Sequence, residues 1–248
     1  MTGKAGWIGR NRRSNCRSTG EMEARVSYSE CADRIYKNAG NLALLDLVKS
    51  KLTGRALDCG CGAGDNARIL RSRGWDVDGI TISPDEQSKA SQVCKTVHLA
   101  DLELGIPAVI SGKYDLVVFS HVLEHLRNPS RALRDVYRVL VPDGVVAVAL
   151  PNVLNWRYRL RFLLGRFDYE EGGIMDSTHL RFYTFVSGRK LLESNGLRIS
   201  VATVEGIFPL VRKTGLPLRI SAFLDRFVST YWPGLFGQQL LYIARVSG

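Results

Sequence analysis

Short apolar runs alternate with amphipathic stretches along most of the chain. Runs typical of buried strands lie at 55–59, 75–82, 96–100, 114–120 and 145–150. Apolar residues recur at helical spacing at about 66–73, from Ser83 and Pro84 onward, and at 129–140. This regular alternation predicts an α/β fold with a parallel, doubly wound sheet and right-handed crossovers.

The pattern is less regular toward the carboxyl end, where an extended polar and aromatic loop interrupts it. Helices are expected at 153–164 and 187–195, and strands at 197–204 and 240–245. An insertion at 206–236 combines apolar residues with prolines, and we expect a helix within it at 222–230. Helical spacing also occurs near the amino end, at 28–51. We expect one domain over 21–248.

The expected helix at 153–164 is amphipathic and basic. Leu160, Leu163 and Leu164 fall on one side, and Arg157 and Arg161 fall on another. Such a helix can form a lid over a pocket, lie weakly on a membrane surface, or simply pack with its arginines in solvent. The pattern leaves these three alternatives open.

Three alternating glycines follow the first strand. Gly60, Gly62 and Gly64 separate the strand from the helix at 66–73. Glycine permits positive φ angles and a close backbone approach, and the helix supplies free N–H groups. Strand, turn and helix therefore form a candidate nucleotide site, in which we also include Cys59.

The spacing of this motif argues against a dinucleotide. A G-x-G-x-x-G fingerprint needs glycine at the position that Asp65 occupies. Asp58 ends the preceding strand, and a carboxylate there favours a cationic ligand over a diphosphate. Cys59 and Cys61 have no second pair of the kind that binds zinc, so we expect no metal site in the chain.

The run L-D-x-G-C-G-x-G at 57–64 resembles the first motif of class I S-adenosylmethionine-dependent methyltransferases. The similarity extends from about 39 to 246. It implies a Rossmann-like sheet of seven strands, with an antiparallel last strand between strands five and six. It also implies S-adenosylmethionine as donor, S-adenosylhomocysteine as product, and Asp58 as the partner of the donor's ammonium group.

The ribose site departs from the usual family pattern. Most members end strand two with an acid, whereas this chain has Thr81 there, followed by Ile82. Cyclopropane-synthase-like and tocopherol-type members show a similar run and use a later glutamine. In this chain Glu86 and Gln87 are the nearest candidates for that role, and the resemblance leaves the choice between them open.

The resemblance places two further groups of donor contacts. Asp101 and Leu102 follow strand three, where an acid contacts the adenine amine in this family. Asp101 can equally be the N-cap of a short helix. Ser120 and His121 end strand four, at the edge of the sheet where ligands bind in open α/β folds.

Candidate catalytic groups gather at the same edge. The segment V-L-E-H at 122–125 resembles ubiquinone-biosynthesis-like and methionine-biosynthesis-like members, and D-x-T-H-L-R-F at 176–182 resembles another branch. Histidine suits proton transfer near neutral pH. We therefore expect His121, His125 or His179 to act as general base. Glu124 is a candidate base, orienting group or metal ligand.

The charge, the motifs and the cysteine content limit the binding partners and the compartment that we expect. The net charge is +10, and five basic residues in 1–20 account for half of it, so we expect a basic disordered tail there. No N/D-P-P-Y motif follows strand four, so we expect no nucleic-acid substrate. The five cysteines suggest reduced thiols and a cytoplasmic protein, monomeric or homodimeric.

The sequence thus favours a methyltransferase for a small-molecule acceptor, with oxygen as the preferred atom. The segments 151–186 and 206–236 would set the acceptor's identity. A binding protein without turnover stays open because of Thr81, and so does a nucleic-acid methyltransferase because of the basic tail.

Overall fold

The computed structural model describes residues 39–48, 53–206, 227 and 230–246. The basic tail at 1–20, most of the helix expected at 28–51 and nearly all of the helix expected at 222–230 lie outside these residues. Among the described helices, none has the length and apolar character needed to cross a bilayer.

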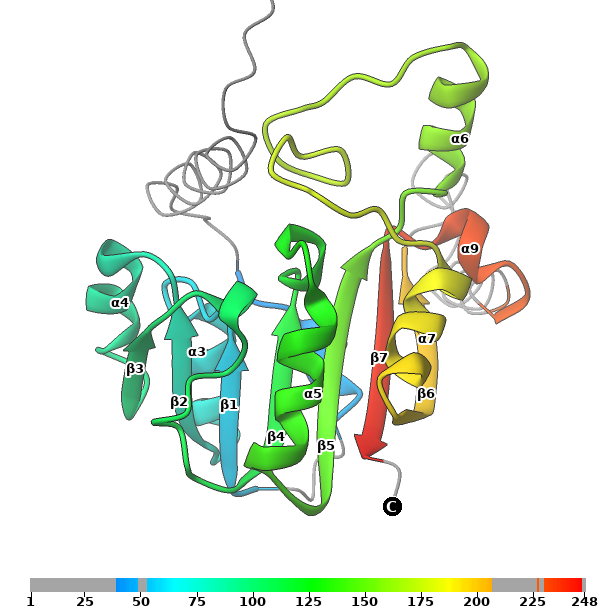
Figure 1. Cartoon of the computed structure of the whole chain (residues 1–248). Coiled ribbons are helices and arrows are strands. Elements are labelled where there is room, and N and C mark those ends of the chain that lie inside the picture. The colour runs from blue at the N-terminus through cyan, green and yellow to red at the C-terminus, as the bar shows by residue number, and fades with distance from the viewer. Residues whose placement is uncertain (1–38, 49–52, 207–226, 228–229, 247–248) are drawn as a thin grey trace, which may run out of the picture.

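A seven-stranded sheet forms the centre of the domain, in the order β3-β2-β1-β4-β5-β7-β6 (Figure 1). β7 pairs antiparallel with both β5 and β6, and the pairs from β3 to β5 are parallel. This confirms the predicted fold class and the place of the antiparallel last strand. The strands are β1 (Arg55–Cys59), β2 (Asp76–Thr81), β3 (Thr96–Leu99), β4 (Tyr114–Ser120), β5 (Leu140–Pro151), β6 (Leu197–Glu205) and β7 (Gln239–Val246).

Helices connect the strands and cover both faces of the sheet. The α-helices are α2 (Leu42–Asp46), α3 (Asp65–Ser72), α4 (Pro84–Ala90), α5 (Pro129–Val139), α6 (Trp156–Leu163), α7 (Phe185–Ser194) and α9 (Pro233–Phe236). Two 3-10 helices, η1 (Leu102–Leu104) and η2 (Leu123–His125), follow β3 and β4. Ser83 caps α4 as expected, accepting the Glu86 N–H with its side chain.

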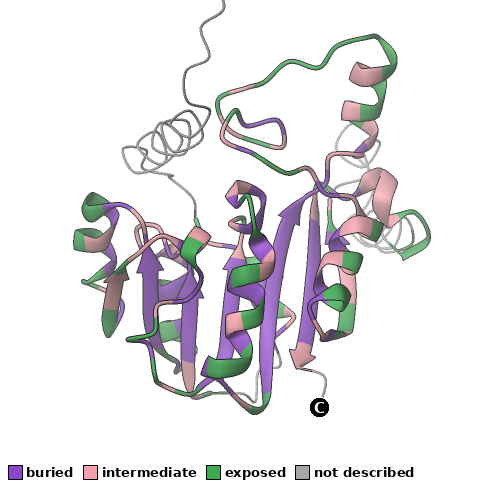
Figure 2. Ribbon diagram, in the orientation of Figure 1, coloured by how far each residue is buried: buried purple, intermediate pink, exposed green. Residues whose placement is uncertain are grey.

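The core consists of two apolar layers, one on each face of the sheet. Alternate residues of β4 enter opposite layers, with Val117 and Phe119 in one and Leu116 and Val118 in the other. Figure 2 shows the inner strands buried along most of their length, whereas β3 and β6 at the two edges and the helices present exposed residues outward. Burial on both faces is why the central strands read as continuous apolar runs.

The start of β5 differs from the prediction. The sequence predicts a strand only from 145, after the turn-forming residues Pro142, Asp143 and Gly144, but β5 runs through these residues from Leu140. Leu140 already pairs with Tyr114, and the register then shifts before Val145. Asp143 absorbs the irregularity with a positive φ of 66°. The turn signal is therefore a bulge within the strand.

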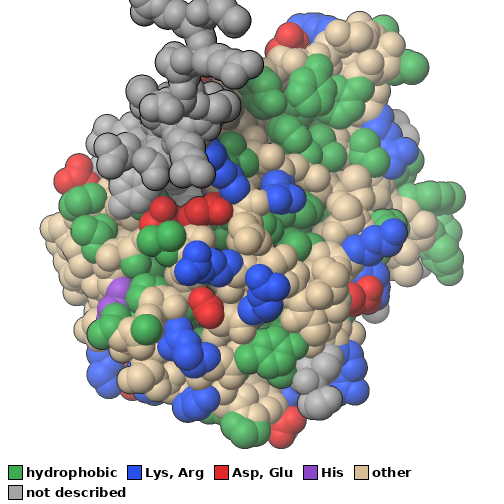
Figure 3. Space-filling model, in the orientation of Figure 1, with side chains coloured by type: hydrophobic (Ala, Val, Ile, Leu, Met, Phe, Trp, Pro, Cys, Tyr) green, Lys and Arg blue, Asp and Glu red, His purple; other side chains and the backbone are tan. Residues whose placement is uncertain are grey.

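α6 and the loop after it lie above the carboxyl edge of the sheet (Figure 1). No residue of α6 is buried, and Leu163 is 83% exposed, so the helix does not enter the core. Aromatic rings hold the helix to the loop, with Phe162 stacked on Phe167 at 5.2 Å and Phe167 edge-on to Phe182. Figure 3 shows hydrophobic side chains gathered over this upper region.

Candidate functional site

A cavity of about 870 Å³ opens at the carboxyl ends of the parallel strands. β1 and β4 flank it, and the strand order reverses between them. Ligands in open α/β sheets bind at such a switch point. Residues 172–174 and 176–180 of the loop after α6 line the opposite wall, so the loop roofs the cavity as a lid would.

The glycine turn forms the floor of this cavity. Gly60, Gly62 and Gly64 all have positive φ angles, at 79°, 52° and 90°. A Cβ on Gly60 would lie 2.3 Å from Cγ2 of Val122, so glycine is needed there for packing. A Cβ on Gly62 would meet nothing closer than Glu86 Oε1 at 3.7 Å, so the space above Gly62 is open to a ligand. Gly64 is the N-cap of α3 and lies outside the cavity wall.

Asp58 and Cys59 lie beneath the turn and are fully buried. Neither belongs to the cavity wall, and Cys59 packs in one of the apolar layers. Burial raises the pKa of Asp58 to about 7, and the neighbouring Asn66 side chain offsets only part of this effect. A cationic group above the turn would stabilise this carboxylate, although the contact itself stays a prediction.

Glu86 and Gln87, the two candidates for the ribose contact, have different surroundings near the end of β2. Glu86 is buried and lines the cavity, and its Oε2 accepts a hydrogen bond of 2.8 Å from the Thr81 hydroxyl. The Gln87 amide instead donates to the backbone carbonyl of Val97, away from the cavity wall. Gln87, expected among the donor contacts, is therefore not in the cavity wall. Glu86 places a carboxylate there, held by the Thr81 hydroxyl, and its contact with a ribose stays a prediction.

The other predicted donor contacts lie in the cavity wall. Ile82, Leu102 and Ser120 all line it. Asp101 does so as well, and it is also the N-cap of η1, with its side chain accepting the Glu103 N–H. Asp101 is therefore both an N-cap and a residue of the cavity wall. Its contact with an adenine stays a prediction.

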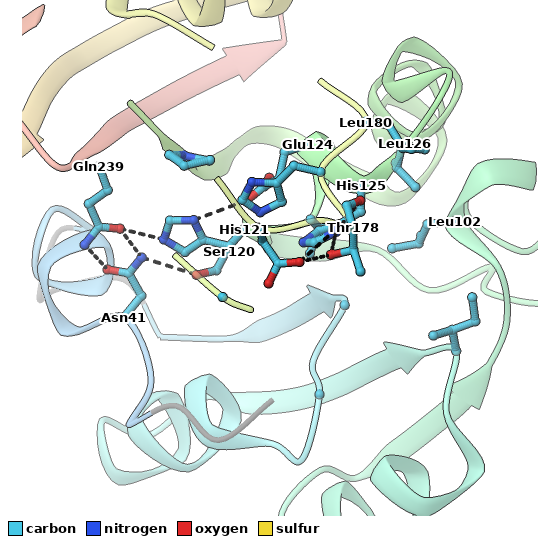
Figure 4. A pocket seen from close by; sticks show the side chains of 18 of the residues that line it. Asn41, Leu102, Ser120, His121, Glu124, His125, Leu126, Thr178, Leu180 and Gln239 are labelled. Atoms are coloured by element: carbon cyan, nitrogen blue, oxygen red, sulfur yellow. Dashed lines mark hydrogen bonds and ion pairs between the residues drawn. The ribbon is translucent and has the colours of Figure 1, made fainter. Parts of the chain in front are cut away.

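His121 and Glu124 form an ion pair at the end of β4 (Figure 4). Nδ1 of His121 lies 3.3 Å from Glu124 Oε1, and Nε2 lies 2.9 Å from Gln239 Oε1. The Asn41 amide donates to that same oxygen, so both ring nitrogens of His121 face acceptors. A φ of 56° holds His121 in the left-handed region that non-glycine residues seldom adopt.

The protonation of this pair follows from its contacts. Burial alone would lower the pKa of His121, but the Glu124 carboxylate and Gln239 reverse the effect, and the pKa is raised. Burial alone would raise the pKa of Glu124, but His121 lowers it. The raised pKa and the acceptors at both ring nitrogens favour the imidazolium form of His121. This disfavours it as the neutral general base that the sequence suggested.

His125 and His179 meet beside Glu124, with ring centroids 4.8 Å apart. Burial lowers the pKa of His125, and the neighbouring His179 lowers it further, so its ring is neutral near pH 7. The structure thus brings together the four predicted catalytic residues His121, Glu124, His125 and His179 at one end of the cavity. All four line its wall.

Hydrogen bonds hold the loop after α6 against η2. The N–H groups of Leu180 and Arg181 both donate to the backbone carbonyl of Glu124, and the Arg181 side chain donates to that of Arg127. Thr178 contacts Nδ1 of His125 through its carbonyl and hydroxyl oxygens. The segment 178–181 is therefore docked on 124–127, which explains why both motifs occur in one chain.

Sequence reasoning missed several residues of this site. Asp176 is buried and accepts hydrogen bonds from the N–H and the hydroxyl of Thr178. An Asp two residues before Thr is typical of an Asx turn, so this signal was present. Asn41 and Gln239 have no comparable signal, because only the insertion of β7 beside β5 brings Gln239 to His121.

A protein-family model and several curated proteins resemble this chain over part of its length. A family model described as a methyltransferase domain matches residues 30–200. A ubiquinone biosynthesis O-methyltransferase of Psychrobacter arcticus is 27% identical over 132 residues, which cover 46% of this chain and 51% of that protein. A malonyl-[acyl-carrier protein] O-methyltransferase of Salmonella typhimurium is 34% identical over 107 residues, 42% of each chain. The chain thus spans about half the length, or less, of these curated relatives.

Solved structures share the fold. A SAM-dependent methyltransferase from Archaeoglobus fulgidus superposes with a TM-score of 0.56 at 19% identity, covering 81% of this chain and 89% of its own. One from Mesorhizobium loti superposes with a TM-score of 0.55 at 20% identity, covering 82% and 95%. At these identities the likeness concerns the fold alone.

Proposed function

The chain belongs to the methyltransferase domain family, within the class that depends on S-adenosylmethionine, and we propose that it methylates an oxygen atom of a small molecule. The observation that carries this proposal is the division of the cavity. The glycine turn and Glu86 lie at one end, and the Glu124, His125 and His179 cluster lies at the other. The two curated relatives described above are named O-methyltransferases, which favours oxygen as the acceptor atom.

The residues of the donor end fit S-adenosylmethionine. The open face of Gly62 leaves room for the close approach of a ligand, and the buried Asp58 carboxylate favours a cationic one. We propose that Glu86 accepts hydrogen bonds from the ribose hydroxyls and that Asp101 accepts one from the adenine amine. This donor supplies an activated methyl group, so the protein mainly orients the reactants and excludes water.

Glu86 also answers the main objection to turnover. The missing acid at the end of β2 favoured a binding protein, because one hydroxyl cannot replace a carboxylate. With Glu86 in the cavity and hydrogen-bonded to Thr81, a carboxylate is present after all. This supports the enzyme over the binding protein.

The acceptor end supplies what an oxygen nucleophile needs. A hydroxyl must lose its proton near the transition state, and a positioned group that assists this loss contributes roughly 10²–10⁴-fold in rate. His125 and His179 face the cavity, and the docked loop fixes both rings. We propose that the acceptor hydroxyl binds against these rings, under the loop at 172–180.

The proposal is tested with the donor product and a panel of acceptors. S-adenosylhomocysteine is expected to bind with micromolar affinity by calorimetry. With S-adenosylmethionine and small hydroxylated acceptors, mass spectrometry is expected to show an O-methylated product. Failure of millimolar S-adenosylhomocysteine to bind or to raise the Tm would contradict the proposal. Methylation confined to nitrogen or carbon acceptors would contradict its acceptor assignment.

A further inference from the structure

Glu124, His125 and His179 form a compact cluster of donor groups in the cavity wall. One ligand atom of each lies within 4.8 Å of the others. The three come from two segments, η2 and the loop after α6, which the hydrogen bonds to the Glu124 carbonyl hold together. Figure 4 shows Glu124 and His125 on neighbouring positions of η2, with Thr178 of the loop against them.

The hydrogen bonds of the two histidines set their tautomers. Nδ1 of His125 lies 3.2 Å from the Thr178 carbonyl oxygen, and Nδ1 of His179 lies 3.0 Å from that of Ile174. A carbonyl oxygen only accepts, so both Nδ1 atoms carry the proton and both Nε2 atoms keep a lone pair. Metal-binding histidines are oriented in the same way, by donating their other ring N–H to a carbonyl or carboxylate.

The position of His125 is further supported from behind. The Thr178 hydroxyl donates to Asp176 Oδ1 at 2.6 Å, so its oxygen can accept from Nδ1 of His125 at 3.1 Å. Asp176 is itself buried. A carboxylate thus orients a hydroxyl, which orients a histidine, as the outer groups around a bound metal do.

The Glu124 carboxylate needs a partner beyond His121. Its side chain is fully buried, and Nδ1 of His121 lies 3.3 Å from Oε1. Among the described residues, none donates a hydrogen bond to Oε2. A buried carboxylate oxygen without a hydrogen-bond donor is destabilising. A cation on the other side of the carboxylate would offset that cost.

We propose that Glu124, His125 and His179 bind a divalent transition-metal ion, with zinc as the best match. Two histidines and one glutamate that leave further positions open are the donor set of several catalytic zinc sites. Ligands of a tetrahedral ion at 2.0–2.1 Å from the metal lie about 3.3 Å apart. The cluster would therefore have to contract by at most about 1.5 Å. This revises the expectation, drawn from the cysteines, that the chain has no metal site.

The role of the ion, though not its binding, rests on the proposed function. An open position facing the cavity would take the acceptor's hydroxyl oxygen and lower its pKa, so that the proton leaves to water. The oxygen lone pair then forms the new O–CH₃ bond while the S–CH₃ bond breaks. Its electron pair stays on sulfur, which becomes a neutral thioether.

Metal binding is tested first, with zinc alone as the probe. The full chain is stripped with a chelator, dialysed and titrated with Zn²⁺ by calorimetry. We expect about one ion per chain and at least 100-fold weaker binding in Glu124→Gln and in His179→Ala. Thr178→Val, which removes an orienting hydroxyl, should weaken binding about 10–100-fold. His98→Ala is the matched control, because His98 in β3 is the one histidine of the chain outside this edge, and it should bind as the wild type does.

The same samples separate this proposal from the proposed function. Binding of S-adenosylhomocysteine and the Tm are measured on each variant to establish folding. A wild-type chain that binds S-adenosylhomocysteine but no zinc would overturn the metal site and leave the methyltransferase standing. Zinc binding equal in the wild type, Glu124→Gln and His179→Ala would overturn it as well. Loss of both zinc binding and activity on chelation, restored together by Zn²⁺, would support it.

Discussion

At the scale of single residues, burial of Asp58 destabilises its charged form. Its pKa is about 7 in the folded protein, against an ordinary value of 3.8, so the folded state binds more protons than the unfolded state between these pH values. The stability of the ligand-free protein should therefore fall as the pH rises through this range. Because burial of the Asp58 carboxylate destabilises the folded protein, we expect this carboxylate to interact with a ligand.

Asp58→Asn tests this directly. The variant should raise the Tm of the ligand-free protein at pH 8 relative to the wild type, by roughly 2–4 °C for each kcal/mol recovered. The gain should shrink toward pH 5, while affinity for S-adenosylhomocysteine falls at both pH values. Thermal unfolding and calorimetry measure the two effects. A variant no more stable at pH 8 than the wild type would show that the buried charge carries no such cost.

Glu86 and Gln87 offer a second comparison at this scale. Glu86→Ala should weaken S-adenosylhomocysteine binding roughly 10- to 150-fold, since hydrogen bonds to a charged group contribute ~1.5–3 kcal/mol. Gln87→Ala is the matched control, because its amide contacts Val97 rather than the cavity, and it should change affinity by less than threefold. Calorimetry on both variants decides between them. The reverse order of effects would favour Gln87 as the ribose contact.

At the scale of elements, contacts between aromatic rings, and not the apolar core, hold the loop after α6 in place. Phe167 stacks on Phe162 of α6 and contacts Phe182, although Phe167 is half exposed. The loop in turn supplies Asp176, Thr178 and His179 to the cavity wall. The acceptor end should therefore depend on this aromatic contact, whereas the donor end should not.

Phe167→Ala separates the two ends. We expect the KM for the acceptor to rise several-fold while the affinity for S-adenosylhomocysteine stays unchanged, because the glycine turn and Glu86 lie on other elements. Val186→Ala, at an exposed position of α7, serves as the control. Steady-state kinetics and calorimetry give the two readings. An equal loss at both ends would show that the loop acts on the whole fold instead of on the acceptor.

The sequence predicted some elements with their residue bounds and missed others for identifiable reasons. β1 and β4 were predicted residue by residue, because both are continuous buried runs with polar residues or glycine after them. β5 was predicted to begin at Val145 rather than at Leu140, because Pro142, Asp143 and Gly144 are typical turn residues. In the structure they lie in an irregular part of the strand. A local signal cannot report the register of a distant strand.

The site was predictable only where one segment carries it. The glycine turn and V-L-E-H are contiguous, so their positions followed from the strand ends. Adjacent helix positions such as Glu86 and Gln87 differ by about 100° in direction, and only the packing of α4 decides which of them faces the cavity. His121 contacts Gln239, 118 residues away, and sequence patterns do not predict this contact.

At the scale of the whole molecule, one sheet edge joins two chemically different ends. The donor end rests on β1 and β2, and the acceptor end rests on η2 and the loop roof, with the switch point of the sheet between them. Everything proposed for the acceptor end requires that the donor binds over the glycine turn. The membrane contact suggested for 153–164 is independent of this and stays a prediction.

Gly62 gives the most direct measurement of that central claim. Gly62→Leu places a bulky side chain where a Cβ meets open cavity, and Gly74→Leu places the same side chain at another positive φ, 88°, with Thr53 Cγ2 as the nearest atom at 3.6 Å. Both variants therefore carry comparable backbone strain, and only one obstructs the cavity. We predict that calorimetry shows at least 30-fold weaker S-adenosylhomocysteine binding in Gly62→Leu and near wild-type binding in Gly74→Leu. Affinity within threefold of the wild type in a folded Gly62→Leu protein would contradict the account.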